Sequence, residues 1–89
     1  MPERFKMVVA NIYSLPRGPV VTGRIEAARV SIGDSLILIG KQGGFPVKVT
    51  SIERFQETLE TADEGSGLVG LTLAGISHDQ IHNRDILIG

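Results

Sequence analysis

The chain has 89 residues, no Cys, and nine Lys and Arg against ten Asp and Glu, for a net charge of -1. This length predicts one domain over residues 1–89 whose core is stabilised by apolar packing alone, because disulfides and thiolate–metal sites are excluded. No basic stripe marks a nonspecific nucleic-acid binder and no apolar run approaches the ~18–20 residues that cross a bilayer, so we expect a soluble, cytoplasmic chain with no membrane attachment.

The apolar residues are mainly Val, Ile and Leu, since the chain has only three Phe, one Tyr and no Trp. Such a composition favours strands. The first strand is expected over residues 5–13, before a turn marked by Pro and Gly at residues 14–18, and the second over residues 20–26. Gly23 lies on the apolar face of the second strand and predicts a close crossing of two backbones, as the corners of a barrel need.

A hairpin is expected next. A Gly-Asp turn at residues 33–34 precedes a strand over residues 35–39, and the glycine-rich segment 40–44 turns the chain back into a strand over residues 45–52. Residues 53–64 are polar and mixed, which indicates either one helical turn or an irregular loop.

Two further strands are expected, over residues 68–73 and 85–88. Between them, Ser-His-Asp-Gln at residues 77–80 matches a capping box and predicts a single helical turn. Six or seven short strands without an ordinary helix predict an all-β fold, a small closed six- to seven-stranded antiparallel β-barrel, because closure removes the exposed edges of a small sheet.

Three separated motifs match a known family. They are Arg-Gly-Pro-Val-Val-Thr-Gly-Arg-Ile-Glu at residues 17–26, Val-Ser-Ile-Gly-Asp at residues 30–34 and Ser-Ile-Glu-Arg-Phe at residues 51–55. Together they resemble the second domain of translational GTPases such as elongation factor Tu, and the resemblance covers essentially the whole chain. It implies a β-barrel of the translation-protein type, here as a stand-alone chain without the GTPase domain that it normally accompanies.

In that family the barrel helps to hold the aminoacylated end of tRNA. The resemblance implies a pocket for the terminal adenosine that uses a Glu, matched by Glu53, an Arg, matched here by Gln56, and an Asn, which residues 65–68 lack. With two of the three polar groups missing, we expect RNA binding to be weak at best. A further departure is Asn83-Arg84, where the family usually has Arg-Gly, so either Arg84 adopts a strained positive φ or Asn83 takes that conformation.

No chemistry beyond binding is expected. The phosphate-binding motif Gly-x-x-x-x-Gly-Lys-Ser/Thr is absent and 89 residues leave no room for a nucleotide-binding domain beside the barrel, so we expect no GTP binding. Ser, His and Asp occur without a nucleophile motif, which predicts a non-catalytic chain with no cofactor. His78 and His82 have the spacing of a helical metal site, but one turn is too short to preorganise ligands, and we interpret this segment as an exposed turn without a metal.

Two sets of residues are candidates for binding. Glu53, Phe55 and Gln56 are either a recognition pocket or an ordinary strand end with Phe55 in the core. Arg17 and Arg24 either meet a phosphate or an acidic partner, or are exposed solubilising charges.

A third candidate is the apolar strand over residues 36–39. Both of its faces are apolar, whereas a barrel strand open to water alternates. Leu36 and Leu38 are expected to fill the barrel, so Ile37 and Ile39 should point outward. There they are covered by a loop, a second copy of the chain or another partner, or simply lie exposed.

Two functional hypotheses follow. The leading one is a non-catalytic, translation-factor-type binding module that docks on a protein or ribonucleoprotein partner through the Ile37 and Ile39 strand and residues 17–26. The alternative is a self-associating structural protein, a homodimer formed by the apolar strand, with no RNA or translation role.

Overall fold

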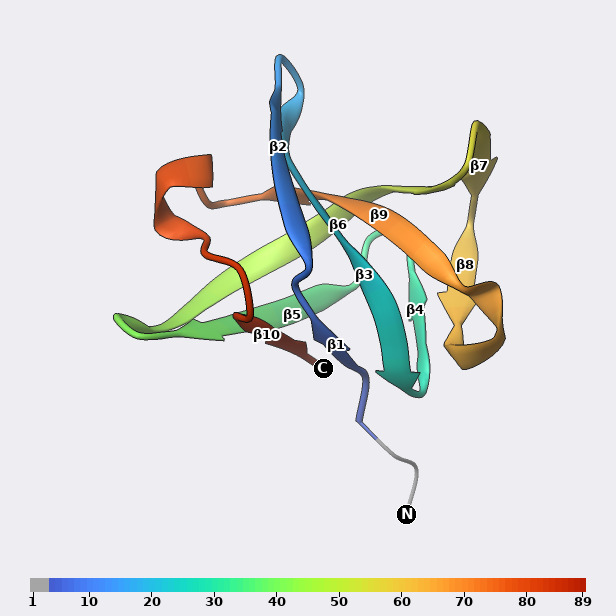
Figure 1. The fold of residues 1–89 in the computed structure, drawn as a ribbon, viewed down its shortest axis with the longest axis horizontal. Helices are drawn as coiled ribbons and strands as arrows, with labels where there is room; N and C mark the ends of the chain where they lie inside the picture. Colours follow the sequence, from blue (N-terminus) through green and yellow to red (C-terminus); the bar gives the residue numbers. More distant parts are fainter. Residues whose placement is uncertain (1–3) are drawn as a thin grey trace.

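The computed structural model describes residues 4–89, in which six antiparallel strands form a ring (Figure 1). In ring order they are β1 (Lys6–Val8), β10 (Ile86–Ile88), β5 (Ser35–Gly40), β6 (Gly43–Arg54), β9 (Leu68–Ala74) and β3 (Gly18–Ala27). The ring is complete because β3 pairs back onto β1, with Met7 opposite Ile25. The predicted closed antiparallel barrel is therefore confirmed, with six strands in the ring.

Four further strands within residues 4–89 lie outside the ring. They are β2 (Asn11–Leu15), β4 (Arg29–Ser31), β7 (Glu57–Leu59) and β8 (Thr61–Asp63). β2 extends one end of β3, β7 folds back on the end of β6, and β4 pairs with β8 in a separate two-stranded sheet. The long strands β3 and β6 thus each carry a hairpin beyond the barrel.

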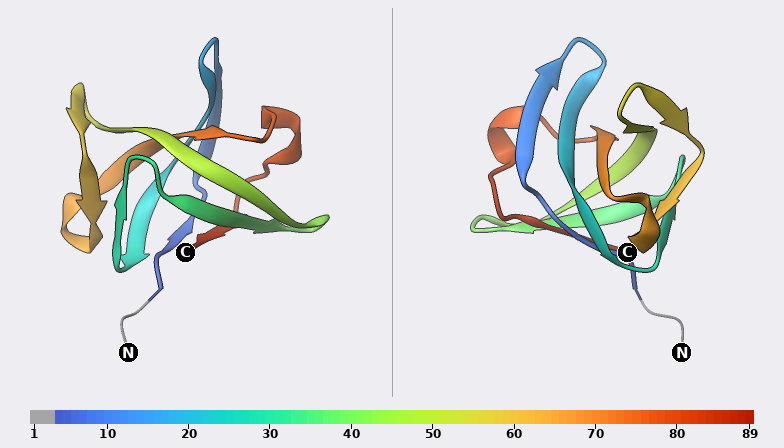
Figure 2. Two further views of the ribbon diagram at one scale, coloured as in Figure 1. Left: turned by 180° about the vertical axis from the view of Figure 1, so that it is seen from behind. Right: turned by 45° about the vertical axis from the view of Figure 1, so that its right-hand side comes forward.

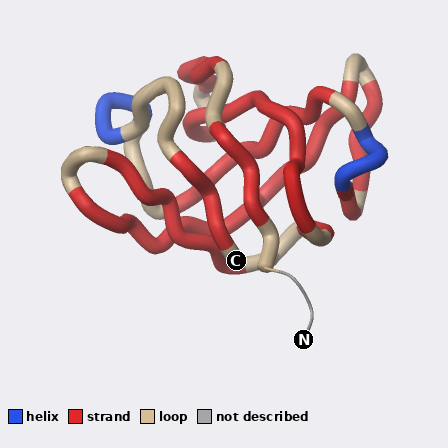
Figure 3. The backbone as a smooth tube through the Cα atoms, turned by 60° about the horizontal axis from the view of Figure 1, so that its bottom comes forward, coloured by secondary structure: helices blue, strands red, loops and turns tan. Residues whose placement is uncertain are grey.

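Two single 3-10 turns complete the structure, η1 (Glu64–Ser66) and η2 (His78–Gln80), on opposite sides of the barrel in Figure 3. η2 lies where the capping box predicts it, and the Gln80 Oε1 accepts a hydrogen bond of 3.1 Å from the backbone N–H of Ser77. No helix within residues 4–89 is long and apolar enough to span a membrane.

Two sequence-based expectations are wrong. Residues 5–13 do not form one strand but bend between β1 and β2, where the Val9 N–H donates to the Asp85 carbonyl at 2.8 Å. Residues 53–64 are neither helical nor irregular, because they contain β7 and β8. The β6–β7 turn depends on Phe55, whose φ of 58° is rare for an aromatic residue, so no ordinary turn signal marks this hairpin.

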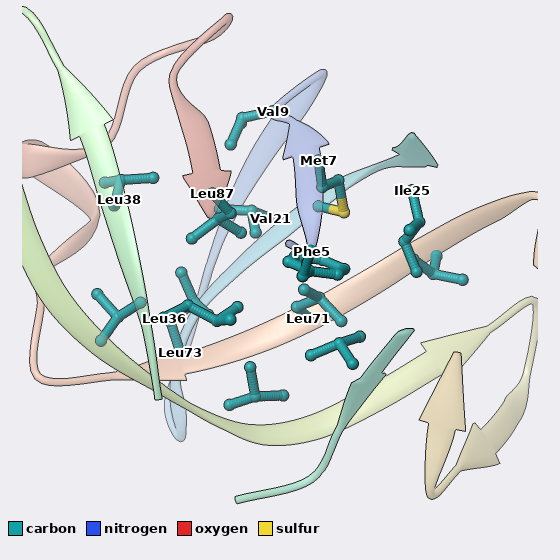
Figure 4. Packing of buried hydrophobic residues seen from close by; sticks show 14 of the residues in the cluster. Phe5, Met7, Val9, Val21, Ile25, Leu36, Leu38, Leu71, Leu73 and Leu87 are labelled. Atoms are coloured by element: carbon teal, nitrogen blue, oxygen red, sulfur yellow. The ribbon is translucent and has the colours of Figure 1, made fainter. Parts of the chain in front are cut away.

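The interior of the ring is filled mainly by aliphatic side chains, together with Phe5 and Met7, as Figure 4 shows for part of the cluster. On β5, Leu36 and Leu38 are buried inside, whereas Ile37 and Ile39 are 44% and 41% exposed on the outer face. The predicted orientation of this strand is therefore confirmed. A strand with two apolar faces fills the core with one and leaves the other on the surface.

Gly23 lies where the bend between β1 and β2 crosses β3. A Cβ placed on Gly23 would be 2.4 Å from the carbonyl oxygen of Val8, a separation that side chains do not adopt. The predicted close backbone crossing at Gly23 is confirmed. Only glycine allows the first segment of the chain to serve both the ring, as β1, and the projecting hairpin, as β2.

We predict that the double substitution Ile37→Lys with Ile39→Lys leaves the barrel folded, because both side chains face outward. Leu38→Lys, on the inner face of the same strand, is the matched contrast. An unpaired buried charge costs several kcal/mol, comparable with the ~5–10 kcal/mol that holds a small domain together. Chemical denaturation followed by circular dichroism measures both, and a double variant as unstable as Leu38→Lys would contradict the orientation of β5.

We also predict that Gly23→Ala destabilises the barrel by more than about 3 kcal/mol, because the added methyl group meets the Val8 carbonyl in a backbone crossing that cannot widen without opening the ring. The control is Gly65→Ala in η1, where the nearest atom to an added Cβ is an Asp63 carboxylate oxygen at 3.4 Å. Thermal unfolding of both variants provides the comparison. Equal stability of the two would show that the crossing is not a constraint.

Candidate functional site

A hollow of about 430 Å³ opens on the outside of the barrel between the β2–β3 hairpin and the β6–β7 hairpin. Both hairpins rise toward the top of the right-hand view in Figure 2. The lining residues are Tyr13, Leu15, Arg17, Val20, Thr22, Glu53, Phe55, Leu68, Val69 and Gly70. The hollow is mostly apolar, with one cation and one carboxylate, a composition typical of small recognition sites.

Strand register explains why the surface is hollow here. On β3, Val20 pairs with Tyr13 of β2, and Thr22 pairs with Gly70 of β9. Gly70 in turn pairs with Glu53 of β6. A residue without a side chain therefore lies between Thr22 and Glu53, and a Cβ at Gly70 would already be 3.3 Å from a Val20 methyl group. Gly70 thus forms the floor of the hollow.

Arg17 and Glu53 form an ion pair across the two hairpins. The Arg17 guanidinium Nη2 donates to the Glu53 carboxylate Oε1, although the two residues are 36 positions apart in the sequence. Arg17 lies in the β2–β3 turn and Glu53 near the end of β6, so the pair links two elements that leave the ring at different strands. Both side chains are partly exposed, and such a pair adds little stability. Its charges therefore stay accessible to a ligand.

Phe55 lies at the edge of the hollow in an unusual state. Its side chain is 93% exposed and its backbone has a φ of 58°. The interpretation that Phe55 packs into the core is therefore wrong. An L-residue in the left-handed region costs about 1–2 kcal/mol, and an exposed ring regains none of it by burial. Backbone strain combined with an exposed aromatic ring keeps Phe55 a candidate binding residue.

The other predicted binding residues lie elsewhere. Gln56 is exposed in the β6–β7 turn but does not line the hollow. Arg24 lines a neighbouring hollow together with Arg84. Of the two residues that the sequence offers for a positive φ, Asn83 and Arg84, it is Arg84 that adopts it, with a φ of 75°. Ile37 and Ile39 lie on β5, which is three strands from β3 in either direction around the ring. The apolar strand and the hollow are therefore on opposite sides of the barrel.

Sequence reasoning missed three apolar residues of the hollow. Tyr13, Leu15 and Leu68 are exposed large side chains at its rim. The alternation on residues 68–73 places Leu68 and Gly70 on the outer face, and a glycine that follows an outward leucine was the available signal. Tyr13 and Leu15 had no such signal. Both lie on β2 (Asn11–Leu15), whereas the apolar run predicts a single strand over residues 5–13.

The two histidines do not lie on one helical turn. His78 lies in η2, whereas His82 follows Ile81, whose φ of -108° and ψ of 137° are extended, so the helical spacing is not formed. Across residues 4–89 there is no group of three or more His, Asp or Glu side chains arranged to hold a metal ion. The exposed-turn interpretation fits both histidines.

Comparison with known proteins identifies the chain as a β-barrel domain of the translation-factor type. No protein-family model matches the chain. Among solved structures, the chain is similar to translation elongation factor SelB from Methanococcus maripaludis in its apo form, with 32% sequence identity and a TM-score of 0.86. The similarity covers 98% of this chain and 19% of SelB, so the chain spans about a fifth of that protein's length.

We predict that Phe55→Gly leaves the stability unchanged or raises it by up to about 1 kcal/mol, because glycine adopts a positive φ without strain and the lost ring buries almost nothing. Chemical denaturation measures the change. A loss of more than about 1 kcal/mol would show that the ring supports the fold, contrary to its exposure.

Proposed function

We propose that this chain, a β-barrel of the translation-factor type, is a non-catalytic binding module that docks on a protein or ribonucleoprotein partner. The observation that carries the proposal is Phe55, an exposed aromatic side chain on a strained backbone beside the apolar hollow. Neither the backbone strain nor the exposed ring stabilises the isolated fold. A partner that covers the ring would bury its apolar surface and so offset the cost of the strain.

The hollow suits one inserted group from such a partner. Its walls are apolar on the β2, β3 and β9 sides, and Arg17 and Glu53 place a donor and an acceptor at its mouth. A flat or branched apolar side chain, or a base at an RNA end, would contact Phe55 on entering. Where the inserted group is a base, its N–H donates a hydrogen bond to the Glu53 carboxylate, which orients it.

Binding rather than catalysis is supported by the chemistry of the lining. Its polar side chains are Tyr13, Arg17, Thr22 and Glu53. Thr22 is the sole aliphatic hydroxyl among them and no histidine lines the hollow, so the usual nucleophile and base are not paired there. The similarity to an elongation factor, SelB, supports a place for the module in translation.

We predict that a partner captured from lysate by the wild-type chain is lost with Phe55→Gly and with Arg17→Ala. Each change removes a contact at the hollow, and such contacts typically weaken binding by about 10-fold to 30-fold. Ile32→Ala is the matched control, because Ile32 is an exposed apolar residue that does not line the hollow. Quantitative mass spectrometry of the captured material, with and without ribonuclease, separates a protein partner from a ribonucleoprotein.

Capture that is unchanged by Phe55→Gly and Arg17→Ala would refute the role of the hollow. The alternative, a self-associating protein, makes a different prediction for the purified chain. Its mass in light scattering would rise with concentration and return to that of a monomer with Ile37→Lys and Ile39→Lys. The experiment thus separates partner binding from homodimer formation.

A further inference from the structure

The outer surface of β5 and β10 carries a block of four isoleucine residues. The pairing of the two strands places Ile39 opposite Ile86 and Ile37 opposite Ile88. Ile37 and Ile39 are exposed, and Ile86 and Ile88 are half-buried. Leu87, between the last two, points into the core, so both strands present isoleucine outward. We call these four residues the isoleucine face.

The strands on either side extend this face without adding an acidic side chain. On β6, Pro46 is opposite Ile37 and Gly44 is opposite Ile39. On β1, Val8 is opposite Ile86, and Lys6 is opposite Ile88. The residues of β6 and β1 that pair with the four isoleucine residues are therefore apolar or basic, in a chain whose net charge is -1.

A rim of cations borders the isoleucine face. Lys41 and Arg84 line a shallow hollow of about 490 Å³ together with Ile39, Ile86 and Asp85. The Asp85 carboxylate is buried and accepts a hydrogen bond of 2.9 Å from the His82 N–H, so the exposed charges of the hollow are the two cations. Lys48 lies on the other side, where it lines a depression with Pro46. Within the described part of the chain, Lys41, Lys48 and Arg84 take part in none of the ion pairs, whereas Lys6 pairs with Glu26 at 3.6 Å.

We infer that the isoleucine face docks an acidic amphipathic segment of a partner protein. The partner's apolar side chains pack on the four isoleucine residues, and its Asp or Glu side chains face Lys41, Lys48 and Arg84. This charge complementarity selects the occupant and orients it. The inference does not depend on the hollow near Phe55, which lies across the barrel, and it gives the module a second partner that binds independently.

Other occupants fit the face less well. In a two-fold dimer the same patch meets itself, which brings the cations of the rim together. A membrane-binding surface needs protruding Trp, Phe or Leu side chains, whereas this face is the flat side of a sheet. A nucleic acid would use aromatic side chains for stacking, and the outward positions of these four strands carry none.

Selection from a display library of random peptides tests the inference. Peptides are selected on the wild-type chain and counter-selected on the double variant Ile39→Ser with Ile86→Ser. We expect the survivors to combine Asp or Glu with Leu, Ile or Phe. Titration of a selected peptide into the isotope-labelled chain should shift the backbone amide signals of β5, β10 and the β5–β6 turn.

Charge reversal gives a test that leaves the isoleucine residues intact. Lys41→Glu with Lys48→Glu should weaken the selected peptide about tenfold, because both side chains lie on the rim. Arg29→Glu, a charge reversal at an exposed position on β4 away from the rim, should alter the affinity less than about twofold, and so should Phe55→Gly at the hollow. Higher salt should weaken binding to the wild-type chain.

Several results would overturn the inference. Selected peptides that are basic or uncharged, or an equal loss of affinity with Arg29→Glu, would contradict the proposed role of the cationic rim. A wild-type dimer in sedimentation velocity that involves the isoleucine face would identify a second copy as the occupant, and binding to anionic vesicles without peptide binding would identify a membrane. Failure of the Phe55 experiment would refute only the proposed function, since the peptide readout belongs to the opposite side of the barrel.

Discussion

The backbone of β1 crosses β3 over Gly23, and both surfaces of this protein depend on that contact. Because no side chain separates Val8 from Gly23, the chain completes the ring as β1 and then leaves it as β2. β6 behaves similarly, since its register shifts between Val49 and Ser51 and its end pairs with β7 outside the ring. The two projecting hairpins enclose the hollow over Gly70. The hollow is therefore a consequence of how the barrel closes.

In this barrel, alternate residues of each strand point inward and outward, and the two sets have different roles. The inward residues fill the core, so the outward residues of the same strands are free to contact other molecules. Within residues 4–89, three non-glycine residues have a positive φ: Ala28, Phe55 and Arg84. Phe55 borders the hollow and Arg84 borders the isoleucine face, whereas the turn at Ala28 is held by a 3.0 Å hydrogen bond from its N–H to Glu64. Strain thus occurs beside both proposed surfaces, as is common where function constrains the backbone.

The two proposed surfaces differ in the chemistry that they offer. The hollow is concave and contains an accessible ion pair and an exposed aromatic ring, and we propose that it holds a single inserted group. The isoleucine face is a shallow sheet surface with cations at its rim, and the proposed occupant is an amphipathic segment. Because they lie on opposite sides of a ring only six strands around, one small domain is able to hold two partners without a clash between them.

The sequence alone determined the barrel, the crossing at Gly23 and the outward orientation of Ile37 and Ile39, because each depends on local two-residue periodicity or on one glycine. It also indicated Arg17, Glu53 and Phe55 as candidates. Tertiary structure decided that Arg17 meets Glu53, 36 residues away, and that β10 places Ile86 and Ile88 beside the predicted pair. It also decided that residues 53–64 contain two strands, since the turn at Phe55 uses a conformation that its residue type disfavours. Which strands become neighbours depends on ring closure, a long-range property that local periodicity does not encode.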